Sequence, residues 1–372
     1  MKPFIPQKLP PSNLEWKEFI PLISKANRSL AYYNGILQGV ANPDLFLSPM
    51  TTQEAVLSSR IEGTQATLSD VFQFEAGETQ KDESKREDIR EIINYRSALH
   101  KAEKELRAKP FNLNLLKELH VLLLNSVRGR DKARGKFRTT QNWIGLPGTP
   151  IEQAQFVPPD PMYLMVHLHH WEKYYHSDEL DALVQLAILH AQFEIIHPFL
   201  DGNGRLGRML IPIFLYEKNV LARPMFYLSA YLETHRDTYY ERLRKLGQSA
   251  EKAWDKWIKF FLAAVDEQAR ENADRARAII SLYDRLKQQV LDLTHSQFAV
   301  PLLDILFEQP IFSSSNIKRK QGMPSTPMIM NLLGTLKTAG ILKVIREGSG
   351  RRGRILVLTE LINLCKGRKV IE

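Results

Sequence analysis

Apolar residues recur at helical spacing along most of this chain. The pattern predicts helices from residue 22 to about residue 107 and again over residues 113–127. Further segments with the same spacing follow at residues 162–175, 181–196, 205–217, 228–246 and 250–293. The first 25 residues are proline-rich and polar, which favours an extended arm. We therefore expect a mainly α fold.

One short region departs from the helical pattern. Residues 137–144 are rich in β-forming side chains, residues 145–148 have the composition of a turn, and residues 155–157 precede two prolines. We expect a β-hairpin over residues 137–157 beside the helical body. A hairpin that only covers the core is the alternative interpretation.

The pattern changes again near residue 295. Three short helical patterns and then two alternating stretches follow, at residues 300–309, 313–321, 325–339, 341–346 and 355–359. Three helices and a hairpin predict a winged-helix domain over residues 295–372. The tip of the hairpin is basic, with Arg346, Arg351, Arg352 and Arg354.

The composition adds limits to this picture. The chain has 372 residues, 44% of them hydrophobic and 25% charged, which is enough for two or three domains. Its formal net charge of +9 suits an anionic partner, whether a nucleotide, a nucleic acid or an acidic protein. The single cysteine, Cys365, cannot form an internal disulfide, so we interpret it as structural and expect a reducing compartment.

Neither a signal peptide nor a membrane span is expected. The N-terminus has no apolar stretch followed by a cleavage site. The most apolar segment, residues 180–196, is interrupted by polar side chains that a bilayer core would reject, namely Asp181, Gln185, His190, Gln192 and Glu194. We expect no membrane association and a cytoplasmic location.

The most informative segment is residues 197–208, with the sequence His-Pro-Phe-Leu-Asp-Gly-Asn-Gly-Arg-Leu-Gly-Arg. Its glycines permit close backbone approach, and the apolar run that follows predicts a helix whose N-terminal amides would hold an anion. Arg205 and Arg208 can bind phosphate oxygens. Asp201 can hold a divalent cation, and His197 can accept a proton near neutral pH. The segment predicts phosphoryl or nucleotidyl transfer; a glycine-rich loop before a core helix is the structural alternative.

This segment matches the pattern His-Pro-Phe-x-Asp/Asn-Gly-Asn-Gly-Arg-x-x-Arg, and on these residues the chain resembles the Fic family. The resemblance implies a Fic helical bundle with the hairpin of residues 137–157 as its flap. It also implies three parts: an N-terminal helical extension over residues 1–108, a catalytic core over residues 109–294, and the winged-helix domain. The implied activity is transfer of AMP from ATP to Tyr, Thr or Ser hydroxyls of target proteins and of the protein itself, with release of pyrophosphate. Targets would dock on the flap.

The resemblance also assigns roles to residues. His197 would be the catalytic base, and Asp201 would bind the Mg²⁺ cofactor. The ATP-binding residues would be Gly202, Asn203, Gly204, Arg205, Leu206, Gly207 and Arg208. Tyr231 and Tyr239 fall where Fic proteins often place aromatic residues near the adenosine, as does Tyr240. Gly204 favours AMP transfer over phosphoryl transfer, because kinase-like Doc proteins have lysine at this position.

A second pattern lies far upstream. Ser58-Ser59-Arg60-Ile61-Glu62-Gly63 fits the inhibitory pattern Ser/Thr-x-x-x-Glu-Gly/Asn of Fic proteins. We expect an inhibitory helix over residues 49–63, with Ser48 as N-cap and Gly63 as the stop, and with Ser58 and Glu62 on one face. By resemblance, Glu62 would pair with Arg208 and keep it from the γ-phosphate of ATP. The chain would then be an autoinhibited adenylyltransferase.

Other functions stay open at this point. The winged-helix domain could make the chain a DNA-binding regulator, with residues 325–339 in a major groove and the tip arginines on phosphates. That segment is mostly apolar, however, and Lys337 is its only basic residue. Transfer of UMP or phosphocholine and removal of AMP are further alternatives. The target protein and the oligomeric state, including a homodimer, cannot be read from the sequence.

Overall fold

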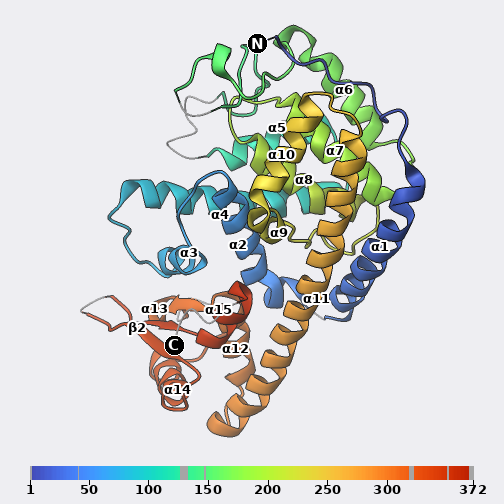
Figure 1. Ribbon diagram of the computed structural model, residues 1–372. Helices are drawn as coiled ribbons and strands as arrows, with labels where there is room; N and C mark the ends of the chain where they lie inside the picture. Colours follow the sequence, from blue (N-terminus) through green and yellow to red (C-terminus); the bar gives the residue numbers. More distant parts are fainter. Residues whose placement is uncertain are drawn as a thin grey trace. The chain divides into compact units, whose positions relative to one another are not determined.

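This computed structural model describes residues 2–40, 42–125, 133–145, 148–317, 322–349 and 352–367. The chain forms two compact units, with residues 1–35, 57–63 and 94–270 in the first and residues 36–56, 64–93 and 271–372 in the second. Both are mainly helical, as the sequence predicts (Figure 1). The division differs from the expected boundaries at residues 108 and 294, which stay predictions. Within the described ranges, no helix has the length and apolar character needed to span a bilayer.

The first unit is a bundle of helices with irregular connections. It contains most of α1 (Trp16–Gly39), the end of α2 (Pro43–Ile61), the second half of α4 (Glu83–Leu106), α5 (Leu113–Leu123), η1 (Ile151–Gln153), η2 (Pro161–Tyr163), α6 (Leu164–Tyr175), α7 (Ala182–Ile196), α8 (Asn203–Glu217), α9 (Ser229–Thr234), α10 (Arg236–Gly247) and the start of α11 (Ala253–Thr294).

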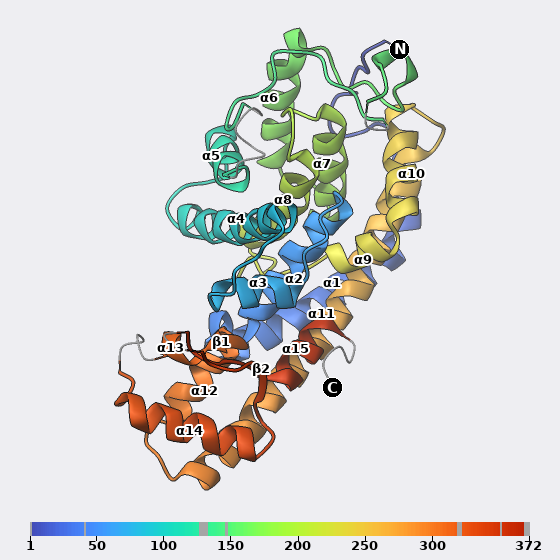
Figure 2. The ribbon, with the colours of Figure 1, turned by 90° about the vertical axis from the view of Figure 1, so that its left-hand side faces the viewer.

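Helices α7 and α8 form the centre of this unit and lie against each other in both views (Figure 2). Asp181 caps the N-terminus of α7, since its carboxylate accepts hydrogen bonds from the N–H groups of Leu183 and Val184, each at 3.0 Å. Every residue from Leu183 to Phe193 is buried. This explains why the segment is apolar on all sides rather than on one stripe. Its end, and the start of α8, are therefore firmly held.

The second unit contains a small antiparallel sheet with helices around it. Its elements include α3 (Leu68–Glu75), α12 (Ala299–Glu308), β1 (Ile311–Ser313), α13 (Ser314–Ile317), α14 (Thr326–Thr338), β2 (Lys343–Arg346), β3 (Ile355–Val357) and α15 (Thr359–Lys366). The strand order is β1-β3-β2. Helix α14 lies on one side of the strands, and α3 packs against β1 (Figure 2). The first and third of the expected helices and the hairpin are confirmed. Of the second, expected over residues 313–321, the described part forms a helix over Ser314–Ile317, and residues 318–321 lie outside the described residues. β1 and α15 are additions, and the winged helix stays our interpretation of this arrangement.

Two helix starts differ from the sequence prediction. Helix α1 begins at Trp16 and includes Pro21, so the N-terminal arm is shorter than expected. Helix α2 begins at Pro43 rather than at Pro49, because Asn42 Oδ1 accepts from Leu45 N (3.3 Å) and so caps the earlier start. Pro49 lies inside the helix. The predicted stop is confirmed, since α2 ends at Ile61 and Gly63 has a φ of +101°.

Two other segments are less regular than expected. The helix predicted over residues 228–246 is divided into α9 and α10 by a break at His235. The hairpin predicted over residues 137–157 contains one isolated bridge, between Ile144 and Phe156, instead of two strands. Residues 146–147 of its turn and residues 126–132 of the segment before it lie outside the described residues.

Candidate active site

His197 follows the last residue of α7 and turns the chain out of the helix. Its backbone has a left-handed conformation (φ 50°, ψ 61°), and its N–H still donates to Phe193 O (3.0 Å). Arg138, near the start of the flap, fixes this turn. Its Nε donates to His197 O (2.9 Å) and its Nη2 to Pro159 O (2.5 Å) and Ile196 O (3.3 Å). The buried Arg138 therefore holds the backbone that presents the imidazole.

The imidazole of His197 is a neutral base in this environment. Its Nδ1 lies 3.4 Å from Glu194 O. Because a carbonyl can only accept, Nδ1 bears the proton and Nε2 is left as the basic nitrogen. Burial lowers the pKa of His197 to about 4. The side chain is thus ready to accept a proton at neutral pH.

The loop after His197 is closed by Asn203. Its Oδ1 accepts from Phe199 N and its Nδ2 donates to Phe199 O, both at 2.9 Å. Gly202, with a φ of +80°, precedes the first residue of α8 and donates its N–H to Asp201 Oδ1 (2.6 Å). The side chain of Asn203 therefore closes the loop from which the N-terminus of α8 begins.

His120 of α5 supports the same loop, and the sequence analysis missed it. Its ring stacks on Phe199 with centroids 3.9 Å apart. Its Nδ1 accepts from Gly135 N (2.8 Å), so its Nε2 donates to Asp201 O (3.1 Å). Burial lowers the pKa of His120 to about 4. A buried histidine on the apolar face of a helix has no distinctive sequence signal.

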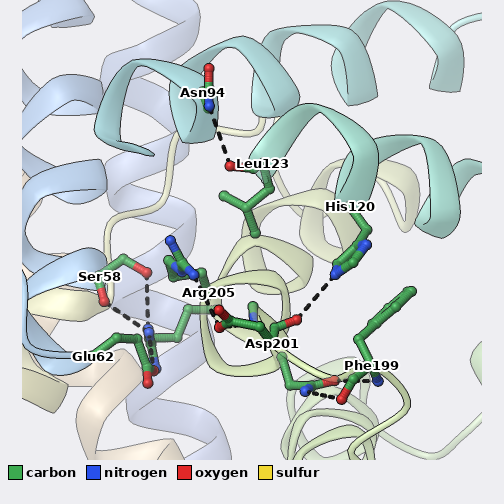
Figure 3. A network of polar contacts seen from close by, with 11 residues as sticks. Ser58, Glu62, Asn94, His120, Leu123, Phe199, Asp201 and Arg205 are labelled. Carbon is green, nitrogen blue, oxygen red and sulfur yellow. Dashed lines mark hydrogen bonds and ion pairs between the residues drawn. The ribbon is translucent and has the colours of Figure 1, made fainter. Parts of the chain in front are cut away.

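Asp201 lies between His120 and Arg205 in Figure 3. The Arg205 Nη2 atom is 3.4 Å from Asp201 Oδ1, and the Asp201 side chain is 43% exposed. No group of three or more His, Cys, Asp or Glu residues that could hold a metal occurs in the described ranges. One accessible carboxylate fits Mg²⁺, which is commonly bound by one or two carboxylates together with substrate phosphates. Asp201 would suit a cation that enters with a polyphosphate.

Arg208 is held by the segment expected to be inhibitory. Its Nε donates to Ser58 Oγ (2.9 Å), and its Nη2 donates to Ser58 O (2.8 Å) and to Glu62 Oε1 (2.6 Å). Burial acts to raise the pKa of Glu62, but the guanidinium of Arg208 outweighs it and lowers the pKa below the usual range. The ion pair is therefore fully charged at neutral pH. We call residues 57–63 the inhibitory segment from here on.

Because Gly204 has no side chain, it leaves room for the Glu62 carboxylate. A Cβ atom at position 204 would come within 2.1 Å of Glu62 Oε1 and 3.0 Å of Arg208 Nη1. Gly207 is equally close to another carboxyl, with Glu194 Oε1 2.2 Å from its ideal Cβ. Leu206 is fully buried, and its N–H donates to Gly202 O (3.0 Å). Gly204 thus faces the Glu62 carboxylate, Gly207 faces the Glu194 carboxyl, and Leu206 packs in the core.

A cavity of about 860 Å³ opens over the motif. It is lined by residues of the inhibitory segment, the flap, α7, α8 and α10, among them Glu62, Trp143, Phe156, Glu194, His197, Gly204, Arg208, Arg236, Tyr239, Tyr240 and Arg244. Its volume falls in the range of small-molecule sites. Trp143, Glu194, Arg236 and Arg244 are residues that the sequence analysis did not select. They lie in no motif and become recognisable only when the chain is folded.

Of the three tyrosines predicted near the adenosine, two line the cavity and one does not. Tyr239 and Tyr240 line the cavity. Tyr239 is buried, and its hydroxyl lies 3.0 Å from His190 Nε2. Tyr231 is outside the set of lining residues; its ring stacks on His235 with centroids 4.0 Å apart. The structure brings Tyr239 to the site and does not bring Tyr231 there.

The flap is joined across its base and covered by the N-terminal arm. Ile144 N donates to Phe156 O (2.8 Å), and Gln155 N donates to Ile144 O (2.8 Å). Phe4 N donates to Val157 O (2.9 Å), and the Phe4 and Phe156 rings lie 5.6 Å apart. Trp143 remains 43% exposed beside the cavity. An exposed aromatic side chain at this place suits contact with another protein.

The arginines expected to bind DNA are partly occupied. Arg346 Nε donates to Glu78 Oε1 (2.5 Å), and Arg354 Nε donates to Glu347 Oε2 (2.7 Å). Arg351 lies outside the described residues. In α14, Met328 and Met330 are exposed. Carboxylates already pair with two of the four arginines, which weakens the case for phosphate contacts.

Comparison with known proteins gives two family matches. Residues 20–104 match the Fic/DOC family N-terminal region, and residues 110–215 match the Fic/DOC family. A probable protein adenylyltransferase of Aquifex aeolicus is 27% identical over 182 residues, which cover 47% of this chain and 51% of that protein. Protein adenylyltransferase Fic of Drosophila virilis is 30% identical over 122 residues, 30% of this chain and 23% of that protein. The chain thus matches about half, or less, of the length of these relatives.

Solved structures support the fold. A Fic family protein from Desulfovibrio desulfuricans covers 96% of this chain, with 98% of its own chain matched, a TM-score of 0.59 and 19% identity. Fic-1 from C. elegans covers 72% of this chain, with 74% of its own chain matched, a TM-score of 0.52 and 19% identity. At this identity the likeness concerns the fold alone.

Proposed function

Because this chain belongs to the Fic/DOC family, we propose that it is an autoinhibited protein adenylyltransferase that uses ATP and modifies hydroxyl side chains of proteins. The observation that best supports the proposal is the cavity in which a neutral His197 and the Glu62–Arg208 ion pair face the same space. The names of the relatives agree with this activity. The target residues would be tyrosine, threonine or serine, on other proteins and on the chain itself.

The reaction needs a base beside the target hydroxyl. His197 Nε2 accepts the hydroxyl proton, and the oxygen forms a bond with the α-phosphorus of ATP. The bond between the α-phosphorus and the oxygen bridging to the β-phosphate breaks, and pyrophosphate leaves. Arg138 and the α7 terminus hold the backbone that presents the imidazole. The neutral form of His197 supports this role, since a protonated imidazole could not accept the proton.

The polyphosphate would bind at the start of α8. Gly202, with its positive φ, directs the first amides of the helix outward, and Arg205 and Arg208 supply positive charge. Asp201 would hold Mg²⁺, which when bound neutralises charge on the phosphates. Tyr239 and Tyr240 would flank the nucleoside, and Arg236, 5.7 Å from the Tyr240 ring, would add charge at the edge of the cavity.

The inhibitory segment would block the last phosphate. Glu62 forms an ion pair with Arg208 and fills the space beside Gly204. A γ-phosphate needs that same guanidinium, and a carboxylate at this place would repel it. ATP would then bind without correct alignment of its α-phosphate. Withdrawal of Glu62 would restore the site without any change in the motif.

The target protein would reach the site along the flap. Pairing of a main-chain segment with the flap orients a hydroxyl without a requirement for particular side chains. Trp143 and Ile144 are exposed there and provide apolar contact. The second unit would regulate or recruit through protein contacts rather than bind DNA, because Arg346 and Arg354 already have carboxylate partners.

The proposal is tested by the mass of the product. The Glu62→Gly variant is incubated with Mg²⁺ and either ATP, UTP or CDP-choline, with and without a cell extract as a source of target proteins. The masses of the modified peptides are then measured by mass spectrometry. We expect an AMP adduct on a hydroxyl side chain that disappears in the Glu62→Gly/His197→Ala double variant. A phosphate, UMP or phosphocholine adduct, or an AMP adduct that persists without His197, would refute the assignment.

A further inference from the structure

Glu194 presents an unpaired carboxyl in the wall of the cavity. Among the described residues, its side chain forms no hydrogen bond or ion pair, and its Oε1 atom is buried. The carboxyl is pressed against α8 at Gly207, where an ideal Cβ would lie 2.2 Å from Oε1. Buried polar atoms in native proteins almost always have a partner. The inhibited arrangement offers none to Glu194.

Arg208, in contrast to Glu194, is a buried charged group with several partners. In the described part of the chain, each of its hydrogen bonds goes to Ser58 or Glu62 of the inhibitory segment. Its side chain is 1% exposed and cannot lose its proton. When the inhibitory segment withdraws, a buried guanidinium loses all these acceptors, which is unfavourable unless another anion replaces them. One γ-phosphate cannot serve every edge of the guanidinium.

We propose that Glu194 becomes the carboxylate partner of Arg208 when the inhibitory segment withdraws, and that it then positions the guanidinium for the γ-phosphate. This inference rests on the proposed function, since it names a positioning residue for the same reaction. A guanidinium can bind a carboxylate on one edge and a phosphate on another because its donors form a planar fork. The released enzyme thus exchanges Glu62 for Glu194.

The charges around Glu194 are consistent with this exchange. Burial, together with the Glu62 carboxylate and against the pull of Arg208, raises the pKa of Glu194 to about 8. Glu194 is therefore neutral at pH 7 and does not compete with Glu62. Loss of Glu62 removes one cause of the raised pKa and leaves the attraction of Arg208, so the pKa of Glu194 falls when the inhibitory segment withdraws. The other titratable groups facing it, Tyr239 and Tyr240, stay neutral because burial raises their pKa values.

Calorimetric binding of ATP with Mg²⁺ tests the inference without any need for turnover. Glu194→Gln keeps the size of the side chain and removes its charge. In the Glu62→Gly background we expect this change to weaken ATP binding about tenfold, and Glu194→Asp to restore part of the loss. With Glu62 present, Glu194→Gln should leave the thermal midpoint unchanged, because the neutral acid and the amide are alike. Glu233→Gln, at a partly exposed carboxyl of α9 outside the cavity, is the control.

The outcomes separate the two claims. Equal ATP affinity of Glu62→Gly and Glu62→Gly/Glu194→Gln, with both folded by circular dichroism, overturns the exchange and leaves the proposed function intact. A loss of affinity that Glu194→Asp does not relieve at all also overturns it, because size rather than charge would then decide. No ATP binding by Glu62→Gly refutes the proposed function, and the exchange with it.

Discussion

Glu62 Oε1 lies 2.6 Å from Arg208 Nη2, although 146 positions separate the two residues in the chain. The same oxygen lies over Gly204, in the space that a Cβ would need. The Glu62 carboxylate therefore pairs with the positive charge of Arg208 and also fills the space beside Gly204 where a phosphate could bind. Under the proposed function, inhibition by Glu62 and binding of a phosphate would use the same few atoms.

Gly204→Ala should displace Glu62. A Cβ at 2.1 Å from the carboxylate oxygen cannot be accommodated, so the ion pair with Arg208 should lengthen or break. Because that Cβ would also take the space that a phosphate needs beside the start of α8, we expect the variant to stay at or below the wild-type rate of AMP incorporation, unlike Glu62→Gly. The measurement is the initial rate with labelled ATP. Gly334→Ala, at a helical glycine with open space around it, is the control, and a rate for Gly204→Ala well above that control would speak against a space shared by Glu62 and the phosphate.

Ser58→Ala should release the inhibition in part. It removes the acceptor of Arg208 Nε at 2.9 Å but keeps the backbone oxygen of Ser58 and the Glu62 ion pair. A hydrogen bond to a charged group contributes about 1.5–3 kcal/mol, so the rate should rise clearly but stay below that of Glu62→Gly. Ser59→Ala is the neighbouring control, because Ser59 Oγ is buried without a hydrogen-bond partner among the described residues. Equal rates for the two alanine variants would remove Ser58 from the account.

The sequence indicates which residues lie near the candidate site, but not how their side chains are directed. His197, Arg208 and Glu62 were predicted because each belongs to a dense local pattern, and the structure brings all three to one cavity. Asn203 and Leu206 belong to the same pattern, yet the side chain of one closes the loop and the other is in the core. Local spacing shows which residues are near a site, whereas the direction of each side chain depends on packing from distant segments.

His190 should make stability depend on pH. Its Nδ1 donates to Gly207 O and its Nε2 accepts from the Tyr239 hydroxyl, both at 3.0 Å, and burial lowers its pKa to about 3. A histidine whose pKa is lower in the folded state binds protons preferentially when unfolded. The free energy of unfolding should therefore be highest above about pH 6.5 and fall as the pH drops toward the folded pKa.

The check is the thermal midpoint from pH 7 to pH 4 for wild type and His190→Gln. The variant should be less stable at pH 7 by roughly 1–3 kcal/mol, because buried partners lose their bonds, and should show a shallower decline. His100→Gln, at an exposed histidine, should follow wild type. Parallel curves for His190→Gln and wild type would show that His190 is not responsible for the decline.

Arg346 should support the second unit rather than bind DNA. Its guanidinium pairs with Glu78 at 2.5 Å and donates to Gly353 O at 3.1 Å. We expect Arg346→Ala to lower the thermal midpoint, with a stability loss of about 1 kcal/mol for a half-exposed pair, and to leave retention on duplex DNA unchanged. Denaturant unfolding and a salt series of mobility shifts measure the two effects. A normal midpoint together with weakened, salt-dependent retention would favour the DNA-binding regulator instead.

The helices were mostly predictable, and the exceptions have physical reasons. Continuous burial on every side made α7 easy to recognise. The predicted start of α2 was wrong because Asn42-Pro43 and Ser48-Pro49 give the same local signal for a helix start. The helix begins at the first of these pairs. The flap was predicted as a regular hairpin, but it has a single bridge, between Ile144 and Phe156, and Phe4 of the N-terminal arm donates its N–H to Val157 O. A contact from the first residues of the chain has no local signature.

The most direct test of the account is the rate of AMP incorporation from ATP labelled at the α-phosphate, compared between wild type and Glu62→Gly under identical conditions. We predict a rate at least about tenfold higher for the variant, because the freed Arg208 can align the γ-phosphate. The increase should vanish when His197→Ala is added. Equal rates for wild type and Glu62→Gly, with both proteins folded and His197 intact, would contradict the claim that Glu62 restrains this site through Arg208.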